Sequence, residues 1–205
     1  MLRIFSRDLI MRVLVLLSGV FLISLGIFLF INSQLGSDPI TVLVNGLSQT
    51  LGITVGQTSF LINSGIILAL MVFTGRKFGI GTILHAVFVG VFLDLLFLLL
   101  GTITPVLMPL RILMLMTAPL FIGSGIAIYI SAGMGEGAIE ALMMFLKEKT
   151  DFSLKAVKVV MDVVFGVTGV VLGSTFGIGT IIGAFTIGPV AQIAFGFVEQ
   201  IKAHN

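Results

Sequence analysis

Long apolar stretches alternate with short loops of Gly, Ser and charged residues along the whole chain. Six of the stretches are long enough to cross the hydrocarbon core of a bilayer, which takes ~20 helical residues. They lie at about 12–30, 55–73, 80–100, 111–130, 156–172 and 180–198. This pattern predicts an all-α integral membrane protein with six transmembrane helices.

Two further apolar segments, at about 39–51 and 138–147, are too short to cross. A helix of about 13 residues rises only ~20 Å, whereas the hydrocarbon core is ~30 Å thick. Each segment follows a Gly-rich turn, so we expect a short re-entrant or interfacial helix at each place.

The two halves of the chain match each other in register. The hexapeptide Phe-Gly-Ile-Gly-Thr-Ile occurs at 78–83 and again at 176–181. An identical hexapeptide inside a collinear register is a specific sign of duplication. We therefore predict a single membrane domain, 1–205, built from two repeats at about 8–100 and 107–199.

The number of crossings and the positive charges predict the orientation of the repeats. Three crossings per repeat is an odd number, so the second repeat enters the membrane from the opposite face. With a cytoplasmic N-terminus, every Lys and Arg except Arg111 falls on the cytoplasmic side, as the positive-inside rule requires. If the short segments also crossed, Arg76 and Lys77 would lie outside. We expect inverted repeats with both termini cytoplasmic, an architecture typical of secondary transporters.

Composition excludes most other classes of protein. The chain is 58% hydrophobic, and only 10% of its residues are charged, against about 25% in soluble domains. It contains no Cys, and no hydrolase, nucleotide-binding or metal motif occurs, so we expect no enzyme activity, cofactor or metal site. No basic run suggests nucleic-acid binding. The expected partners are the lipid bilayer and an unknown small solute or ion, with a homo-oligomer possible through Gly-rich helix faces.

Polar residues inside apolar segments are the candidates for function, because an ionisable group costs at least ~2.5–3.5 kcal/mol at the centre of a transmembrane helix. The candidate substrate- or ion-binding residues are Ser37, Asp38, Asn63, Glu136, Glu140 and Asp162. The supporting polar residues are His85, Asp94 and Gln192.

Matched positions carry most of these candidates. Asp38 and Glu136 lie in the equivalent turns that open the two short helices, where N–H groups can bind an anion or carboxylates a cation or proton. Asn63 is equivalent to Asp162 in the middle of a crossing helix, and Asp94 is likewise equivalent to Gln192.

Structural alternatives stand beside each functional interpretation. Asp38, followed by Pro39, has the sequence of a helix N-cap. Asn63 can clamp neighbouring helices by hydrogen bonds, and His85 can do the same. Asp162 lies four residues after Lys158, a spacing that predicts an ion pair within the helix.

The Gly-Ser-Asp-Pro turn at 36–39 and the repeated hexapeptide resemble the YczE/YyaS/YitT family of bacterial membrane proteins, and within it the YczE-like branch. The resemblance runs over nearly the whole chain. It implies a multi-spanning fold in the bacterial plasma membrane and transfers no catalytic residues.

We expect a small secondary transporter or permease-like protein, with its site at the interface of the two repeats. The alternative is a membrane scaffold or regulatory protein that transports nothing; its repeat interface would be packed, and its partner surface would be the connector at 147–158. An intramembrane enzyme is a third possibility, which the missing nucleophile motifs disfavour.

Overall fold

The computed structural model describes residues 2–103 and 105–203, and its helices are joined by short loops. The helices are α1 (Leu2–Ser33), α2 (Pro39–Leu51), α3 (Val55–Thr74), α4 (Ile80–Leu100), α5 (Met108–Ser131), α6 (Ala138–Lys149), α7 (Leu154–Val171) and α8 (Ile178–Ala203). The side chains of Arg3, Arg7 and Lys202, which enter the predicted orientation, lie outside the described part, as does His204.

Turn residues set the ends of the helices. Asp38 is the N-cap of α2, with Pro39 in its first turn, and Gly52 ends α2 in the left-handed conformation at φ 67°. Thr54 and Gln57 then form a capping box that starts α3. The chain can therefore reverse between α2 and α3 within a few residues.

Several helices begin or end outside the predicted segments, three of them for a reason visible in the sequence. Ser153 accepts a hydrogen bond from the Ala156 N–H, and this cap starts α7 at Leu154, two residues before the predicted start. Helix α5 starts at Met108, because Pro109 is well tolerated in a first turn. Helix α1 extends to the charged N-terminal region, well before position 12.

Five helices are long and apolar enough to span a membrane: α1, α3, α4, α5 and α8. The predicted sixth crossing, α7, has 18 residues but carries Lys155, Lys158 and Asp162, and these charges keep it out of that set. The short helices α2 and α6 have 13 and 12 residues, too few to cross. The described residues therefore form an all-helical protein with five candidate spans.

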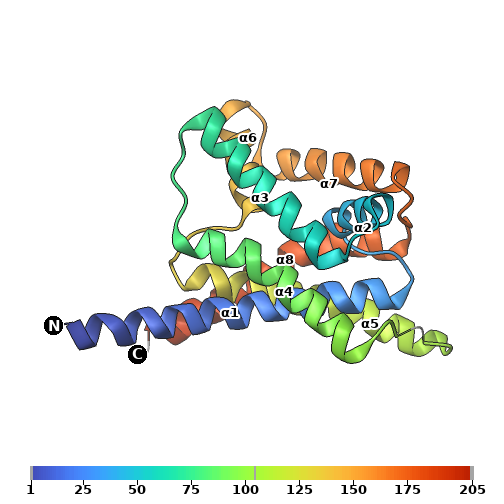
Figure 1. The fold of residues 1–205 in the computed structure, drawn as a ribbon, viewed down its shortest axis with the longest axis horizontal. Helices are drawn as coiled ribbons and strands as arrows, with labels where there is room; N and C mark the ends of the chain where they lie inside the picture. The colour runs from blue at the N-terminus through green and yellow to red at the C-terminus, as the bar shows by residue number, and fades with distance from the viewer. Residues whose placement is uncertain (1, 104, 204–205) are drawn as a thin grey trace.

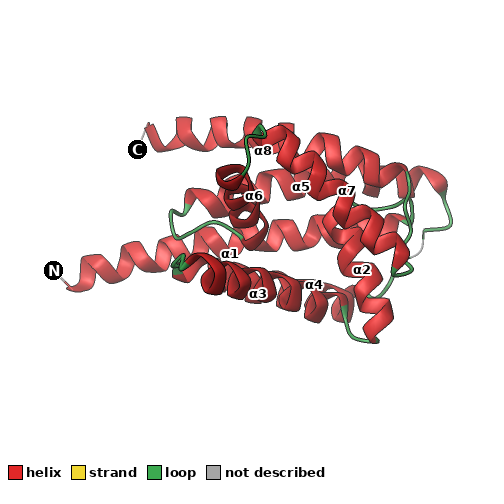
Figure 2. Ribbon diagram, turned by 90° about the horizontal axis from the view of Figure 1, so that it is seen from above, coloured by secondary structure: helices red, strands yellow, loops and turns green. Residues whose placement is uncertain are grey.

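The helices form two layers, which lie one above the other in Figure 1. The lower layer contains α4, α1, α5 and α8 side by side in that order, and the contact between α1 and α5 is the most extensive in the molecule. The upper layer is a ring in which α2 and α6 each pack against both α3 and α7. Figure 2 shows both ends of the chain on the same side of the molecule.

Helices α1 and α5 cross through equivalent small residues. A side chain at Gly19 would meet the carbonyl oxygen of Gly125 at 2.7 Å. The positions 99 residues away behave in the same way, because a side chain at Gly26 would meet the carbonyl oxygen of Ala118 at 2.7 Å. Small residues let the two backbones approach closely, and the crossing contacts are reciprocal between the halves.

Backbone hydrogen bonds between the halves are also reciprocal. The Gly179 N–H donates to the Leu35 carbonyl at 2.8 Å, and the Gly81 N–H donates to the Met134 carbonyl at 3.0 Å. Leu35 and Met134 are equivalent in the sequence repeat, as are Gly81 and Gly179. The start of each half's last helix is thus tied to the turn of the other half.

The two layers touch closely at one edge and barely at the other. Helix α3 packs on α4 at Gly56 and Gly90, where a side chain at Gly90 would meet the Gly56 carbonyl oxygen at 2.5 Å. The equivalent residues in the second half are Lys155 and Gly188, and a Cβ at Gly188 would have no neighbour within 4 Å. Since the bulky Lys155 replaces a glycine, α7 and α8 make few contacts.

Asp94 braces the closed edge. Its carboxylate accepts hydrogen bonds from the Gly56 N–H at 2.9 Å and from the Thr54 hydroxyl at 2.6 Å, so α4 caps the start of α3. Gln192, its equivalent on α8, is exposed. The second half thus lacks both the glycine contact and the cap.

Candidate functional site

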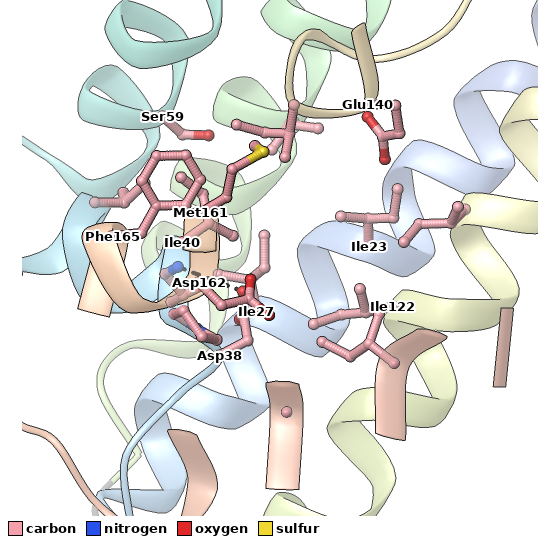
Figure 3. Close-up of a pocket in the computed structure, with 18 of the residues that line it drawn as sticks. Ile23, Ile27, Asp38, Ile40, Ser59, Ile122, Glu140, Met161, Asp162 and Phe165 are labelled. Atoms are coloured by element: carbon pink, nitrogen blue, oxygen red, sulfur yellow. Dashed lines mark hydrogen bonds between the residues drawn. The ribbon is translucent and has the colours of Figure 1, made fainter. Parts of the chain in front are cut away.

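A cavity of about 280 Å³ lies between the two layers, and all eight helices contribute to its wall. We call it the central cavity. Most of its wall is apolar, with isoleucines of α1 and α5 on one side (Figure 3). Its polar side chains are Asp38, Thr41, Ser59, Asn63, His85, Glu140, Lys158 and Asp162. The first half of the chain supplies five of them and the second half three.

Asp38 enters the central cavity from the turn before α2. Its Oδ2 caps the helix by accepting a long hydrogen bond, 3.4 Å, from the Thr41 N–H. Its Oδ1 is buried without a hydrogen-bond partner among the described residues. Gly183 of α8 makes room for it, since a Cβ there would lie 2.8 Å from the Asp38 Cβ. Capping therefore accounts for only one of the two carboxylate oxygens.

The surroundings of Asp38 make its negative charge more costly than in water. Burial raises the pKa of the Asp38 carboxyl, and the negative charge of Asp162 raises it further. Hydrogen bonds from Thr41 and the positive charge of Lys158 act in the opposite direction. A proton or another cation that approaches Oδ1 would offset the cost of the buried charge.

Lys158 and Asp162 form the ion pair expected from their four-residue spacing on α7, with 2.7 Å between Nζ and Oδ2. Both residues line the central cavity. Because Lys158 already pairs with Asp162, the wall holds no second Lys or Arg for the carboxyl groups of Asp38 and Glu140.

Asn63 faces the central cavity from α3. Its side-chain N–H donates to the Ser59 carbonyl one turn earlier at 2.8 Å, so this bond lies within one helix and does not clamp two helices together. The side-chain oxygen is buried and has no hydrogen-bond partner among the described residues. Asn63 thus offers a free acceptor to the cavity.

A second polar cluster, the His85 cluster, gathers over Gly137. The Tyr129 hydroxyl accepts a hydrogen bond from the Gly137 N–H at 3.1 Å, and the His85 and Tyr129 rings lie 4.7 Å apart. Glu140 completes the cluster beside the hydroxyl. A Cβ at Gly137 would meet the Tyr129 hydroxyl at 2.9 Å and the His85 ring at 3.2 Å, so only glycine fits here.

Burial also raises the pKa of Glu140 in this cluster. Hydrogen bonds from its own backbone N–H and from Tyr129 oppose the shift, as does the positive charge of Lys158. His85 Nδ1 is buried without a partner among the described residues. In Figure 3, Glu140 and Asp38 lie at different ends of the central cavity.

The two ends of the cavity occupy equivalent positions of the sequence repeat with exchanged residues. Asp38 is equivalent to Gly137, and Gly183 is equivalent to His85. Asp38 packs against Gly183 at one end, whereas Gly137 packs against His85 at the other. Each end therefore pairs one glycine with one polar side chain. At one end the polar side chain, Asp38, lies in the turn before a short helix, and at the other end it is His85, on the last helix of a half.

Five of the nine predicted polar residues line the central cavity: Asp38, Asn63, His85, Glu140 and Asp162. The other four lie elsewhere. Glu136 pairs with Arg76, 2.5 Å apart, and Asp94 caps α3. Gln192 is exposed, and Ser37 lines a separate pocket.

Sequence reasoning missed three polar residues of this region. Ser59 lies four residues before Asn63, so helical spacing alone puts it on the same face. Thr41 is the equivalent of Glu140 in the other half, so the register of the repeat could have identified it as a candidate. Tyr129, the single tyrosine of the chain, has no local signal, because its partners come from α4 and α6.

A second, polar pocket of about 370 Å³ lies beyond the Asp38 turn and is lined by Ser37, Asn45, Arg111 and other polar residues. Arg111 donates to the Ser33 and Gln34 carbonyls at 2.8 Å each, which neutralises the C-terminal end of α1. Ser37 lines this pocket and Asp38 lines the central cavity. A single turn of chain therefore separates the two spaces.

Comparisons with known proteins cover most of the chain. A model described as "Family of unknown function (DUF6198)" matches residues 10–195. The "Uncharacterized membrane protein YczE" of Bacillus subtilis (strain 168) is 30% identical over 203 residues, 98% of this chain and 92% of that relative. An "Uncharacterized protein" of Haemophilus influenzae is 28% identical over 91% of this chain and 84% of its own length.

The "Uncharacterized protein YyaS" of Bacillus subtilis is also similar, with 26% identity over 89% of this chain and 91% of its own length. No solved structure is significantly similar. The name of the first relative and the apolar helices together are consistent with a membrane location.

Proposed function

This chain belongs to the YczE/YyaS family, within the family of unknown function DUF6198, and from its geometry we propose that it is a small secondary transporter of the bacterial plasma membrane. The central cavity would hold the transported solute or ion. One observation carries the proposal: three buried polar atoms that line this cavity, on Asp38, Asn63 and His85, have no hydrogen-bond partner among the described residues.

Unpaired buried polar atoms are expensive. Each costs ~1–3 kcal/mol, so natural proteins keep few of them unless a ligand or water satisfies them. Among the described residues, three of the five such side-chain atoms belong to residues that line one space between the two halves, which is where secondary transporters with inverted repeats bind their substrates. A membrane scaffold would have a packed interface between the two halves. The cavity of about 280 Å³ at this interface disfavours that alternative.

The proposed topology has six crossings in two inverted repeats, with α7 as the sixth and both termini in the cytoplasm. The ion pair of Lys158 with Asp162 supports α7 as a crossing helix, because pairing lowers the cost of both charges. The reciprocal contacts of α1 with α5 support the inverted repeat. Both chain ends lie on one side of the molecule, as an even number of crossings requires (Figure 2).

Transport would proceed by rocking of the upper layer on the lower one. The α3–α4 edge is closed by the Gly56–Gly90 contact and the α7–α8 edge is open, so the observed arrangement has one closed and one open edge. In the reverse arrangement the α7–α8 edge would be closed and the α3–α4 edge open, so the cavity would be exposed at the other edge. The Asp38 turn borders both the central cavity, through Asp38, and the polar pocket, through Ser37.

The chain contains no Cys, so single-cysteine accessibility tests the proposal directly. Ser59→Cys and Ile187→Cys place a thiol in the central cavity from the upper and the lower layer. In a transporter, an impermeant thiol reagent labels both thiols from either face of the membrane in oriented vesicles. Labelling of the cavity thiols from one face only would contradict alternating access.

Two exposed positions serve as controls for the topology. Thr150→Cys, between α6 and α7, reacts from the cytoplasmic face only in the proposed orientation. Val106→Cys, between α4 and α5, reacts from the external face only; Val106 is 97% exposed. If both controls react from the same face, the six-crossing inverted topology is wrong.

A further inference from the structure

We propose that the central cavity binds small amphipathic ammonium compounds, with the charged nitrogen at Asp38 and the apolar body against the isoleucine wall. The inference rests on the proposed function in placing the transported solute in this cavity. It goes further in naming the chemical class: a primary or secondary amine carried on a small hydrocarbon body.

The balance of charges in the wall selects a cation. Among the side chains that line the cavity, Lys158 is the single Lys or Arg, and Asp162 already pairs with it at 2.7 Å. The wall has no second Lys or Arg for Asp38, and Glu140 lies in the His85 cluster. A buried carboxylate without a counter-charge is costly, so a cationic ligand gains more here than a neutral or anionic one.

The unpartnered atoms select a ligand that donates hydrogen bonds. Asp38 Oδ1 and Asn63 Oδ1 are acceptors, and both are buried in side chains that line the cavity, with the whole residues only 5% and 7% exposed. An ammonium group brings two or three N–H donors at one point. A carboxylate or phosphate would bring further acceptors and would leave both of these atoms unpaired.

The apolar wall selects an organic cation over a bare metal ion. Metal ions such as Ca²⁺ require about six to eight oxygen ligands, and no group of three His, Asp or Glu side chains suited to a metal occurs among the described residues. Ile23, Ile27 and Ile122 instead offer hydrocarbon surface (Figure 3). Burial of an apolar body against them contributes about 25 cal/mol per Å².

The size of the cavity limits the ligand. Its volume of about 280 Å³ is at the lower end of the ~300–1,000 Å³ usual for small-molecule sites, which indicates a ligand with one small ring or a short chain.

Three probes of nearly the same shape test the assignment: 2-phenylethylammonium, 2-phenylethanol and phenylacetate. Each is titrated into the purified full-length protein in lipid nanodiscs, with calorimetry and thermal unfolding as measurements. We expect the ammonium compound to bind at least 10-fold more tightly than the alcohol and to raise the Tm. Phenylacetate should bind most weakly of the three.

Asp38→Asn tests the residue. Asparagine caps a helix as well as aspartate does, so the variant keeps the start of α2 while it loses the charge. We expect a loss of 10-fold or more in affinity for 2-phenylethylammonium and no change for 2-phenylethanol. Glu148→Gln, which removes an exposed acid from α6, is the matched control and should bind as the unaltered protein does.

Several outcomes would overturn the assignment. Equal binding of the three probes, tighter binding of phenylacetate, or unchanged ammonium affinity in Asp38→Asn would each do so. The comparison of probes on the unaltered protein does not depend on any variant folding. Binding is measured at equilibrium, whereas cysteine accessibility measures exposure to the two faces of the membrane. If the protein binds the ammonium compound but fails the accessibility test, transport is disproved and the ligand class is still supported.

Discussion

The first half of this protein holds α3 tightly on α4, whereas the second half leaves α7 apart from α8. Most residues of these helix pairs differ between the halves, and two pairs of positions bear directly on the contact. Gly56 and Asp94 close the first edge, and Lys155 and Gln192 stand at their equivalent positions. Equivalent positions of the two halves therefore hold a close helix contact in one half and none in the other.

The largest expected difference comes from replacing one glycine with alanine at equivalent positions of the two halves. Gly90→Ala places a Cβ 2.5 Å from the Gly56 carbonyl oxygen, so we expect a loss of about 1–3 kcal/mol from overpacking. Gly188→Ala at the equivalent position meets nothing within 4 Å, and it should gain up to ~1 kcal/mol from helix propensity. Thermal unfolding of both variants in the same detergent measures the difference.

Gly65→Ala is a second control for that comparison, because it lies on α3 and a Cβ there has no neighbour within 4 Å. If Gly90→Ala and Gly188→Ala shift the Tm equally, the closed edge does not depend on the glycine contact.

A smaller effect is expected from the cap between α4 and α3. Asp94→Ala removes the acceptor for the Gly56 N–H and the Thr54 hydroxyl, which should cost about 1–2 kcal/mol. Gln192→Ala changes an exposed side chain and should stay within about 0.5 kcal/mol of the unaltered protein. Hydrogen exchange at the first turn of α3 reports whether the loss is local, and uniform exchange across both halves would argue against a bracing role.

The smallest effect is a dependence of stability on pH at Asp38. Burial raises the pKa of this carboxyl in the folded protein, so the folded state binds more protons than the unfolded state. Its contribution is favourable at low pH and is lost as the pH rises through the folded pKa. Lys158 and Asp162 are the charged groups that face it.

Asp38→Asn should flatten that decline in Tm between about pH 4, where free carboxyls titrate, and neutral pH. Addition of 2-phenylethylammonium to the unaltered protein should do the same. A pH profile that Asp38→Asn leaves unchanged would show that other groups cause the decline.

Local signals predicted most of the helices and the residues whose surroundings are local. Asp38 and Pro39 indicate a helix start in any context, and the spacing of Lys158 and Asp162 indicates a pair within one helix. The repeat register added equivalences, including that of His85 with Gly183. They were sufficient to identify Asp38 as a candidate binding residue and His85 as a supporting polar residue, but they did not predict that the two lie at opposite ends of one cavity.

Partners distant in sequence account for what the pattern could not predict. Glu136 lies in the turn that is equivalent to the Asp38 turn. It forms an ion pair with Arg76, 60 residues away, and does not line the central cavity. Asp94 is within an apolar helix, but its carboxylate serves the start of α3. Helix periodicity gives the depth and face of a side chain, and only the packing of helices decides which group it meets.

The exchange of residues between the two ends of the cavity has an evolutionary consequence. Two identical chains that assembled around the same cavity would present the same side chains at both ends, either two acids or two histidines. Fusion of the copies into one polypeptide removes that constraint, because each position can mutate alone. Asp38 facing Gly183, with Gly137 facing His85, is an asymmetry that a symmetric dimer cannot have, and it makes the two ends of the cavity chemically different.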